Sequence, residues 1–162
     1  MGRMLLGEAE RLILLLEEKG WRVAVAESCT GGLLCAEFVK VPGASKVLAG
    51  GVVAYSRDAK RRLLNAPDAL LDQGMASPDI AAAMARGAAA LLGADVGIAA
   101  TGAAGPDAMD CIPPGEVYVG VVWPGGALTE KSVISGSRED VMRGAVEAAI
   151  AVALSGLAGQ SI

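Results

Sequence analysis

The chain has 162 residues, of which 53% are hydrophobic and only 3% aromatic, and its formal net charge is −4. This length suits one domain over residues 1–162, which can bury roughly 70% of its unfolded surface. The acidic balance and the lack of a long Lys/Arg cluster argue against a nucleic-acid partner. The longest uninterrupted apolar run, residues 148–154, is too short to cross a bilayer, so we expect no membrane partner.

Histidine is absent from the sequence. Its absence excludes Ser-His-Asp and Cys-His catalysis and most zinc sites. A base that works near neutral pH must then be a carboxylate, a tyrosine, a lysine or a thiolate. The three cysteines, Cys29, Cys35 and Cys111, form no CxxC pair, and reduced thiols in a cytoplasmic protein are the simplest interpretation.

Helical and strand patterns alternate along the first part of the chain. Apolar residues recur at helical spacing from Leu5 to Leu16, Gly20 ends this helix, and an apolar strand follows over 23–26. A helix over about 31–40, a strand over 47–55 and a short helical piece through residue 64 come next. Gly50 and Gly51 indicate a bulge or a close backbone approach in the second strand.

The later part of the chain adds two helices and three strands. Ser77 and Pro78 are typical of a helix start, and this helix continues to Leu92 before a strand over 96–100. A Gly- and Pro-rich loop over 101–115 precedes a hairpin of 116–123 and 128–135, and a capping box opens the last helix, over about 138–155. These elements predict an α/β fold, a three-layer α/β/α sandwich around a mixed sheet.

Three predicted strand ends, at Glu27, Tyr55 and Thr101, lead into polar loops. Ligands of open α/β sheets bind at the carboxyl ends of the strands, so we expect a single site built from these loops. After the first strand, the free amides of a helix start at Gly31 and Gly32 could hold a phosphate or stabilise an oxyanion. The alternative is that Thr30 only caps a helix after a tight turn.

Without histidine, a serine nucleophile needs another base. Ser28 is one candidate nucleophile, and Ser45, in the loop before the second strand, is its rival. Cys29 is intrinsically more nucleophilic but has no evident activating partner, which favours a structural thiol.

Lys60 is the candidate base, because burial lowers the pKa of an ammonium toward neutrality. Tyr55 could orient this lysine or relay its proton. The alternatives are a solvated surface lysine beside Arg61 and Arg62, and an aromatic side chain that packs at the rim of the sheet.

Other candidate binding groups come from the later loops. Thr101, Gly102 and Gly105 offer a hydroxyl and backbone donors, with ordinary turn chemistry as the alternative. Arg138 at the start of the last helix could bind a phosphate together with the helix amides, or could simply be exposed.

Taken together, four segments resemble the CinA C-terminal domain family, whose active members are nicotinamide mononucleotide deamidases. The resembling segments are AESCTGG at 26–32, GVVAYS at 51–56 followed by Lys60, TGAAGPD at 101–107 with PGEV at 114–117, and GSR at 136–138. The resemblance implies a CinA-like fold and hydrolysis of nicotinamide mononucleotide to nicotinate mononucleotide and ammonia, within the pyridine nucleotide cycle.

The resemblance also implies roles for individual residues. It implies serine–lysine chemistry that needs no cofactor or metal, with Ser28 or Ser45 as nucleophile and Lys60 as base. The resemblance further implies that Tyr55 is the partner of Lys60 and that Arg138 pairs with the phosphate. It implies that Thr101 and the backbone amides of the turn at Thr30, Gly31 and Gly32 polarise the carbonyl.

One loop departs from the family pattern. The family commonly continues GPDGG into a Lys-Pro-x-Gly segment, whereas Ala108 and Met109 follow Asp107 here. The change removes backbone freedom and a possible cation. Two alternatives therefore remain, a non-catalytic nucleotide-binding or regulatory module and an amidase for a different carboxamide.

The helices predicted over 80–92 and 141–154 are rich in small residues, which permits close packing between subunits. They predict a homodimer or a larger homo-oligomer.

Overall fold

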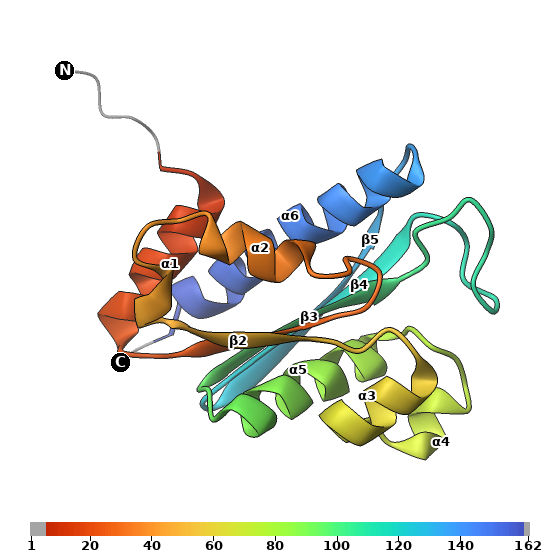
Figure 1. Ribbon diagram of the computed structural model, residues 1–162, viewed down its shortest axis with the longest axis horizontal. Coiled ribbons are helices and arrows are strands. Elements are labelled where there is room, and N and C mark those ends of the chain that lie inside the picture. The colour runs from red at the N-terminus through yellow and green to blue at the C-terminus, as the bar shows by residue number, and fades with distance from the viewer. Residues whose placement is uncertain (1–5, 161–162) are drawn as a thin grey trace.

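The computed structural model describes residues 6–160 (Figure 1). The first helix begins at Glu8, and Leu5, where the sequence pattern started, lies outside the described residues. The helices are α1 (Glu8–Lys19), α2 (Leu33–Val39), the 3₁₀ turn η1 (Ala44–Lys46), α3 (Arg57–Leu64), α4 (Asp68–Leu71), α5 (Pro78–Leu92) and α6 (Arg138–Ala158), and the strands are β1 (Val23–Glu27), β2 (Leu48–Val53), β3 (Val96–Gly102), β4 (Glu116–Trp123) and β5 (Gly126–Val133).

The five strands form one mixed sheet in the order β2-β1-β3-β4-β5. β1 pairs in parallel with both β2 and β3, whereas β4 runs antiparallel to β3 and β5 runs antiparallel to β4. The three parallel strands therefore end at the same edge of the sheet, and the hairpin extends the sheet on the β3 side.

Helices cover both faces of this sheet (Figure 1). Apolar residues of α1, α2 and α6 pack with Val23, Val25, Ile98 and Val119 on one face. Residues of α3, α4 and α5 pack with Ala24, Ala26 and Ala99 on the other. Successive strand residues alternate between these two cores, as the pleat requires. The predicted three-layer α/β/α sandwich is confirmed.

Several helix starts and one strand irregularity lie where the sequence predicted them. Ser77 caps α5 through its side chain, and the capping box of Ser137 and Asp140 opens α6. The expected irregularity in β2 is also present, since Leu48 and Gly50 lie opposite the consecutive residues Val23 and Ala24. The insertion of one residue into β2 is thus a bulge that Gly50, at φ +156°, accommodates.

Within residues 6–160, α6 is the one helix long and apolar enough to be considered as a membrane span, and half of the relevant stretch is buried inside the domain. Val146, Ala149, Ile150 and Ala153 of this helix belong to the core against the sheet. This burial is typical of the core helix of an α/β layer.

Helix α5 lies unusually close to the sheet because glycines face it. An added Cβ at Gly97 of β3 would overlap the backbone carbonyl of Ala85, and one at Gly120 of β4 would overlap the backbone of Ala81. Side-chain atoms at these positions would force the helix away from the sheet.

We therefore expect Gly97→Ala to lower the free energy of unfolding by about 2 to 3 kcal/mol, because the helix backbone cannot yield without repacking. Urea denaturation measures this effect. Gly159→Ala is the matched control, since nothing lies within 4 Å of the position of its added Cβ. An equally small effect of both substitutions would contradict the close packing described here.

Candidate active site

The ends of the three parallel strands converge. Glu27, the last residue of β1, lies opposite Val53 of β2 and Ala100 of β3. Ser28 follows Glu27 directly, and its amide donates to Ala100 O at 3.0 Å. Polar residues after the three strands therefore meet at one edge, as the sequence predicted.

The central contact of this edge joins Lys60 to Ser28. Lys60 Nζ donates to Ser28 Oγ at 2.9 Å, to Ala54 O at 3.1 Å and to Tyr55 O at 3.4 Å. Lys60 is only 1% exposed and Ser28 only 6% exposed. The structure thus brings together the predicted base and one of the two predicted nucleophiles, away from bulk water.

Lys60 is buried because of its place on α3. Ser56 caps this helix, accepting a hydrogen bond from Ala59 N at 3.1 Å, and Lys60 and Leu64 form its buried face at i, i+4 spacing. Gly87 of α5 lets the helices approach, since an added Cβ there would overlap the carbonyl of Leu64. The close approach turns the Lys60 face of α3 toward the sheet.

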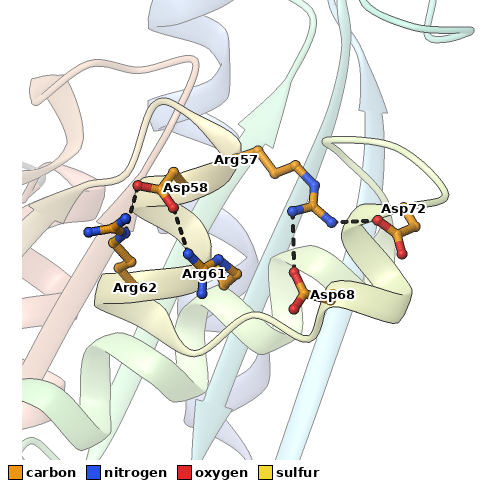
Figure 2. A network of polar contacts seen from close by, with 6 residues as sticks. All are labelled: Arg57, Asp58, Arg61, Arg62, Asp68 and Asp72. Carbon is orange, nitrogen blue, oxygen red and sulfur yellow. Dashed lines mark hydrogen bonds and ion pairs between the residues drawn. The ribbon is translucent and has the colours of Figure 1, made fainter.

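The other cations of α3 point outward and are paired. Asp58 lies between Arg61 and Arg62, and Arg57 lies between Asp68 and Asp72 (Figure 2). The N–O distances from Asp58 to Arg61 and Arg62 are 2.8 and 2.7 Å. Each of these pairs is exposed and contributes little to stability. Lys60, in contrast, is buried and is not the solvated neighbour of Arg61 and Arg62 that the sequence left as an alternative.

Burial also changes the protonation of Lys60. Loss of hydration lowers the pKa of its ammonium from 10.5 to about 8. About a tenth of the molecules then carry a neutral amine at pH 7. A neutral amine has two N–H groups for the carbonyls of Ala54 and Tyr55 and one lone pair for the hydroxyl of Ser28. The same geometry therefore suits a base that accepts the serine proton.

Cys29 is a poor competitor for Ser28. Its side chain is 6% exposed, and burial raises the pKa of the thiol to about 12. The thiol is protonated at neutral pH, and a protonated thiol is a weak nucleophile. The structural role expected for this residue agrees with its environment.

Glu27 has a structural role at the site that the sequence did not predict. Its side chain is fully buried, and its carboxylate accepts hydrogen bonds from the amides of Gly32 at 3.1 Å, Leu34 at 2.8 Å and Cys35 at 3.0 Å. A carboxylate at the N-terminus of a helix satisfies unpaired amides and interacts favourably with the helix dipole. Glu27 thus fixes α2 to the residue immediately before Ser28.

This arrangement corrects the expected role of the glycine turn. The Gly32 amide is occupied by Glu27, and the Gly31 amide donates to Ser28 O at 3.2 Å. Thr30 does not cap α2: the N-cap position is Gly32, and Thr30 Oγ1 is buried with no hydrogen-bond partner among residues 6–160. The turn shapes the backbone around Ser28 and offers these amides to no ligand.

A pocket of about 210 Å³ opens beside Ser28. Its other lining residues come mainly from the loop after β3, with contributions from the turn after β2 and the start of α6: Cys29, Tyr55, Gly102, Ala103, Ala104, Gly105, Asp107, Met109 and Arg138. The backbone amides of Cys29, Ala104 and Gly105 donate to no other residue within the described part of the chain. They are available as donors to a ligand.

Tyr55 and Arg138 meet at this pocket. Arg138, the first residue of α6, donates to Gly105 O and, at 3.2 Å, to Tyr55 Oη. The phenol of Tyr55 therefore contacts Arg138, while only the backbone carbonyl of Tyr55 contacts Lys60. The side chain of Tyr55 is 61% exposed, so it borders the pocket and does not orient the lysine.

Thr101 and Ser45 lie in the expected segments, but neither lines the pocket beside Ser28. Thr101 is fully buried and its hydroxyl donates to Met75 O at 3.4 Å, whereas the neighbouring Gly102 lines the pocket. Ser45 is exposed in η1, which precedes β2 at the opposite, amino edge of the sheet. The chain itself does not bring Ser45 to Lys60.

The fold and this site together define a class: a three-layer α/β domain with a buried serine–lysine pair at the carboxyl edge of its sheet. Within residues 6–160, no group of three or more Cys, Asp or Glu side chains is arranged to hold a metal ion.

The family model of the CinA C-terminal domain matches residues 7–157, and the chain belongs to this family. A Desulforamulus reducens protein named as competence-damage inducible is 42% identical over 147 residues, covering 90% of this chain and 36% of the relative. The chain thus spans about a third of the length of the curated relatives it matches.

Solved structures agree over nearly the whole chain. A CinA superfamily protein from Klebsiella pneumoniae has 33% identity and a TM-score of 0.90, covering 94% of this chain and 97% of that one. A competence/damage inducible protein from Agrobacterium tumefaciens has 30% identity and a TM-score of 0.86, with 97% and 99% coverage. These names place the chain in a family and specify no reaction.

The role of Glu27 can be tested by removing its charge. We expect Glu27→Gln to lower the free energy of unfolding by about 2 to 3 kcal/mol, because an amide accepts fewer hydrogen bonds and buries an unpaired NH₂ group. Urea denaturation measures the change. Glu37→Gln is the control, because Glu37 lies on α2 itself in an exposed pair with Lys40, and it should change stability by less than about 1 kcal/mol.

The pKa of Lys60 predicts a pH dependence of stability. The folded-state pKa, about 8, lies below the ordinary value of 10.5, so the unfolded chain binds more protons between these two pH values. The stability of the wild-type protein relative to Lys60→Met should therefore rise from pH 8 to pH 10.5, by at most about 3 kcal/mol. Urea denaturation of both proteins at several pH values tests this, and a constant difference would contradict it.

Proposed function

We propose that this domain is an amidohydrolase that converts nicotinamide mononucleotide to nicotinate mononucleotide and ammonia, with Ser28 as nucleophile and Lys60 as base. The observation that carries the chemistry is the 2.9 Å contact between Lys60 Nζ and Ser28 Oγ, made by a lysine that is 1% exposed. The choice of substrate rests on the resemblance of the motifs around this pair to those of nicotinamide mononucleotide deamidases.

The proposed reaction uses these two groups. As Ser28 Oγ attacks the carboxamide carbon, the neutral amine of Lys60 takes the hydroxyl proton. The resulting ammonium returns that proton to the amide nitrogen, the C–N bond breaks, and ammonia leaves an ester on Ser28. Water then attacks the ester with Lys60 again accepting a proton, and the acid product and free Ser28 are released.

The surroundings of the pair support charge stabilisation during this sequence. The oxygen of the carbonyl becomes negative when Oγ attacks, and free amides of Cys29, Ala104 or Gly105 at the pocket are suitable donors. The amides of Gly31 and Gly32, favoured from the sequence, are occupied and leave this role to other groups.

The shape of the site is consistent with a mononucleotide. The pocket, at about 210 Å³, is smaller than most ligand pockets of about 300 to 1,000 Å³, so it encloses only the reactive end of a nucleotide. Arg138 is exposed at its rim and could hold the phosphate, with one donor already shared with Tyr55 Oη.

An ammonia-release assay tests the proposal. We expect the purified protein to release ammonia from nicotinamide mononucleotide, with kcat/KM rising with pH and levelling off above the pKa of Lys60, about 8, because only the neutral amine is a base. Ser28→Ala and Lys60→Met should each lower turnover about a thousandfold or more.

Two further serine variants serve as controls. Ser135→Ala changes an exposed serine of the loop before α6 and should leave turnover unchanged. Ser45→Ala should have at most a small effect, since Ser45 lies at the opposite edge of the sheet. Loss of turnover in Ser45→Ala would instead mean that this edge takes part, for example from a second chain.

Calorimetry and ammonia release from other carboxamides separate the alternatives. Binding of the mononucleotide without ammonia release would favour a non-catalytic binding module. Release of ammonia only from another carboxamide would favour a different amidase. The absence of both binding and release for the mononucleotide would overturn the proposal.

A further inference from the structure

Asp107 is a charge in the pocket that the proposed chemistry leaves without a role. Its side chain lines the same pocket as Ser28 and Arg138, yet its carboxylate makes no hydrogen bond or ion pair within residues 6–160. Arg138 donates to Gly105 O and Tyr55 Oη instead. The pocket therefore holds an acid and a guanidinium that do not neutralise each other.

Two unpaired charges of opposite sign suit a ligand that also carries both signs. The pocket is also lined by the buried residues Gly102 to Gly105, which limits screening by water there. Asp107 itself is exposed, so its attraction for a cation is moderate and weakens as salt is added.

We infer that Asp107 selects substrates in which the ring that bears the carboxamide is a cation, that is, N-substituted pyridinium carboxamides with an anionic group at the other end. This inference rests on the proposed function. The reacting carboxamide must lie against Ser28, and Asp107 borders the same small pocket, whereas an anionic end fits the rim at Arg138.

Binding of two matched ligands tests the inference. Nicotinamide mononucleotide and its 1,4-dihydro form have the same carboxamide and phosphate, but only the first has a cationic ring. We would measure both dissociation constants by calorimetry on Ser28→Ala protein, which cannot hydrolyse them, after confirming its folding by thermal denaturation. We expect the cationic form to bind about fivefold more tightly, and Asp107→Asn in this background to remove that preference by weakening only the cationic form.

Asp110→Asn is the matched control. It makes the same charge change in the same loop, but its carboxylate accepts from Met75 N and does not line the pocket, so the preference should remain. Equal weakening of both ligands by Asp107→Asn, or no preference in the parent protein, would overturn the inference. If wild-type protein still releases ammonia in that case, the proposed function stands alone; if neither ligand binds and no ammonia forms, both fail.

Discussion

Removing an ammonium group from water is unfavourable, and the rest of the site depends on how this domain does so. Lys60 is held under the sheet edge by three oxygen acceptors and by the close packing of α3 against α5. The loss of hydration lowers the pKa of the amine and so favours its neutral form. A histidine would be a base near neutral pH without any burial, because its ordinary pKa is already about 6.5. A chain without histidine can obtain a base near neutral pH in this way, provided that the surrounding helices are rigid enough to keep water out.

The second constraint is the carboxylate of Glu27. Its three hydrogen bonds occupy the amides at the start of α2, which would otherwise form an anion site next to Ser28. A negative side chain thus occupies the helix amides next to Ser28, and the positive charge that lines the pocket is that of Arg138. Ser28 then lies between α2, which Glu27 fixes, and the loop that lines the pocket.

Much of this could be predicted from the sequence because the signals are local. Ser77 and Ser137 predicted the starts of α5 and α6, and Gly50 and Gly51 predicted the irregularity in β2. The ends of parallel strands in an α/β pattern also lie at one edge of the sheet, which predicted the position of the site. Other features depend on contacts between distant segments. The helix of Lys60 is rich in charges, and only the spacing of Lys60 and Leu64 hinted at a buried face. The roles of Glu27 and Thr30 depend on how the turn at Gly31 and Gly32 folds back, and residue types alone do not specify that path.

The close approach of Gly87 to the carbonyl of Leu64 connects α5 with α3, the helix that carries Lys60. The two helices approach backbone to backbone there, with no flexible side chain between them. We therefore expect a displacement of α5 to move α3 as well. A substitution that displaced α5 would therefore also displace Lys60 relative to Ser28, although the substituted residue lay far from the pocket.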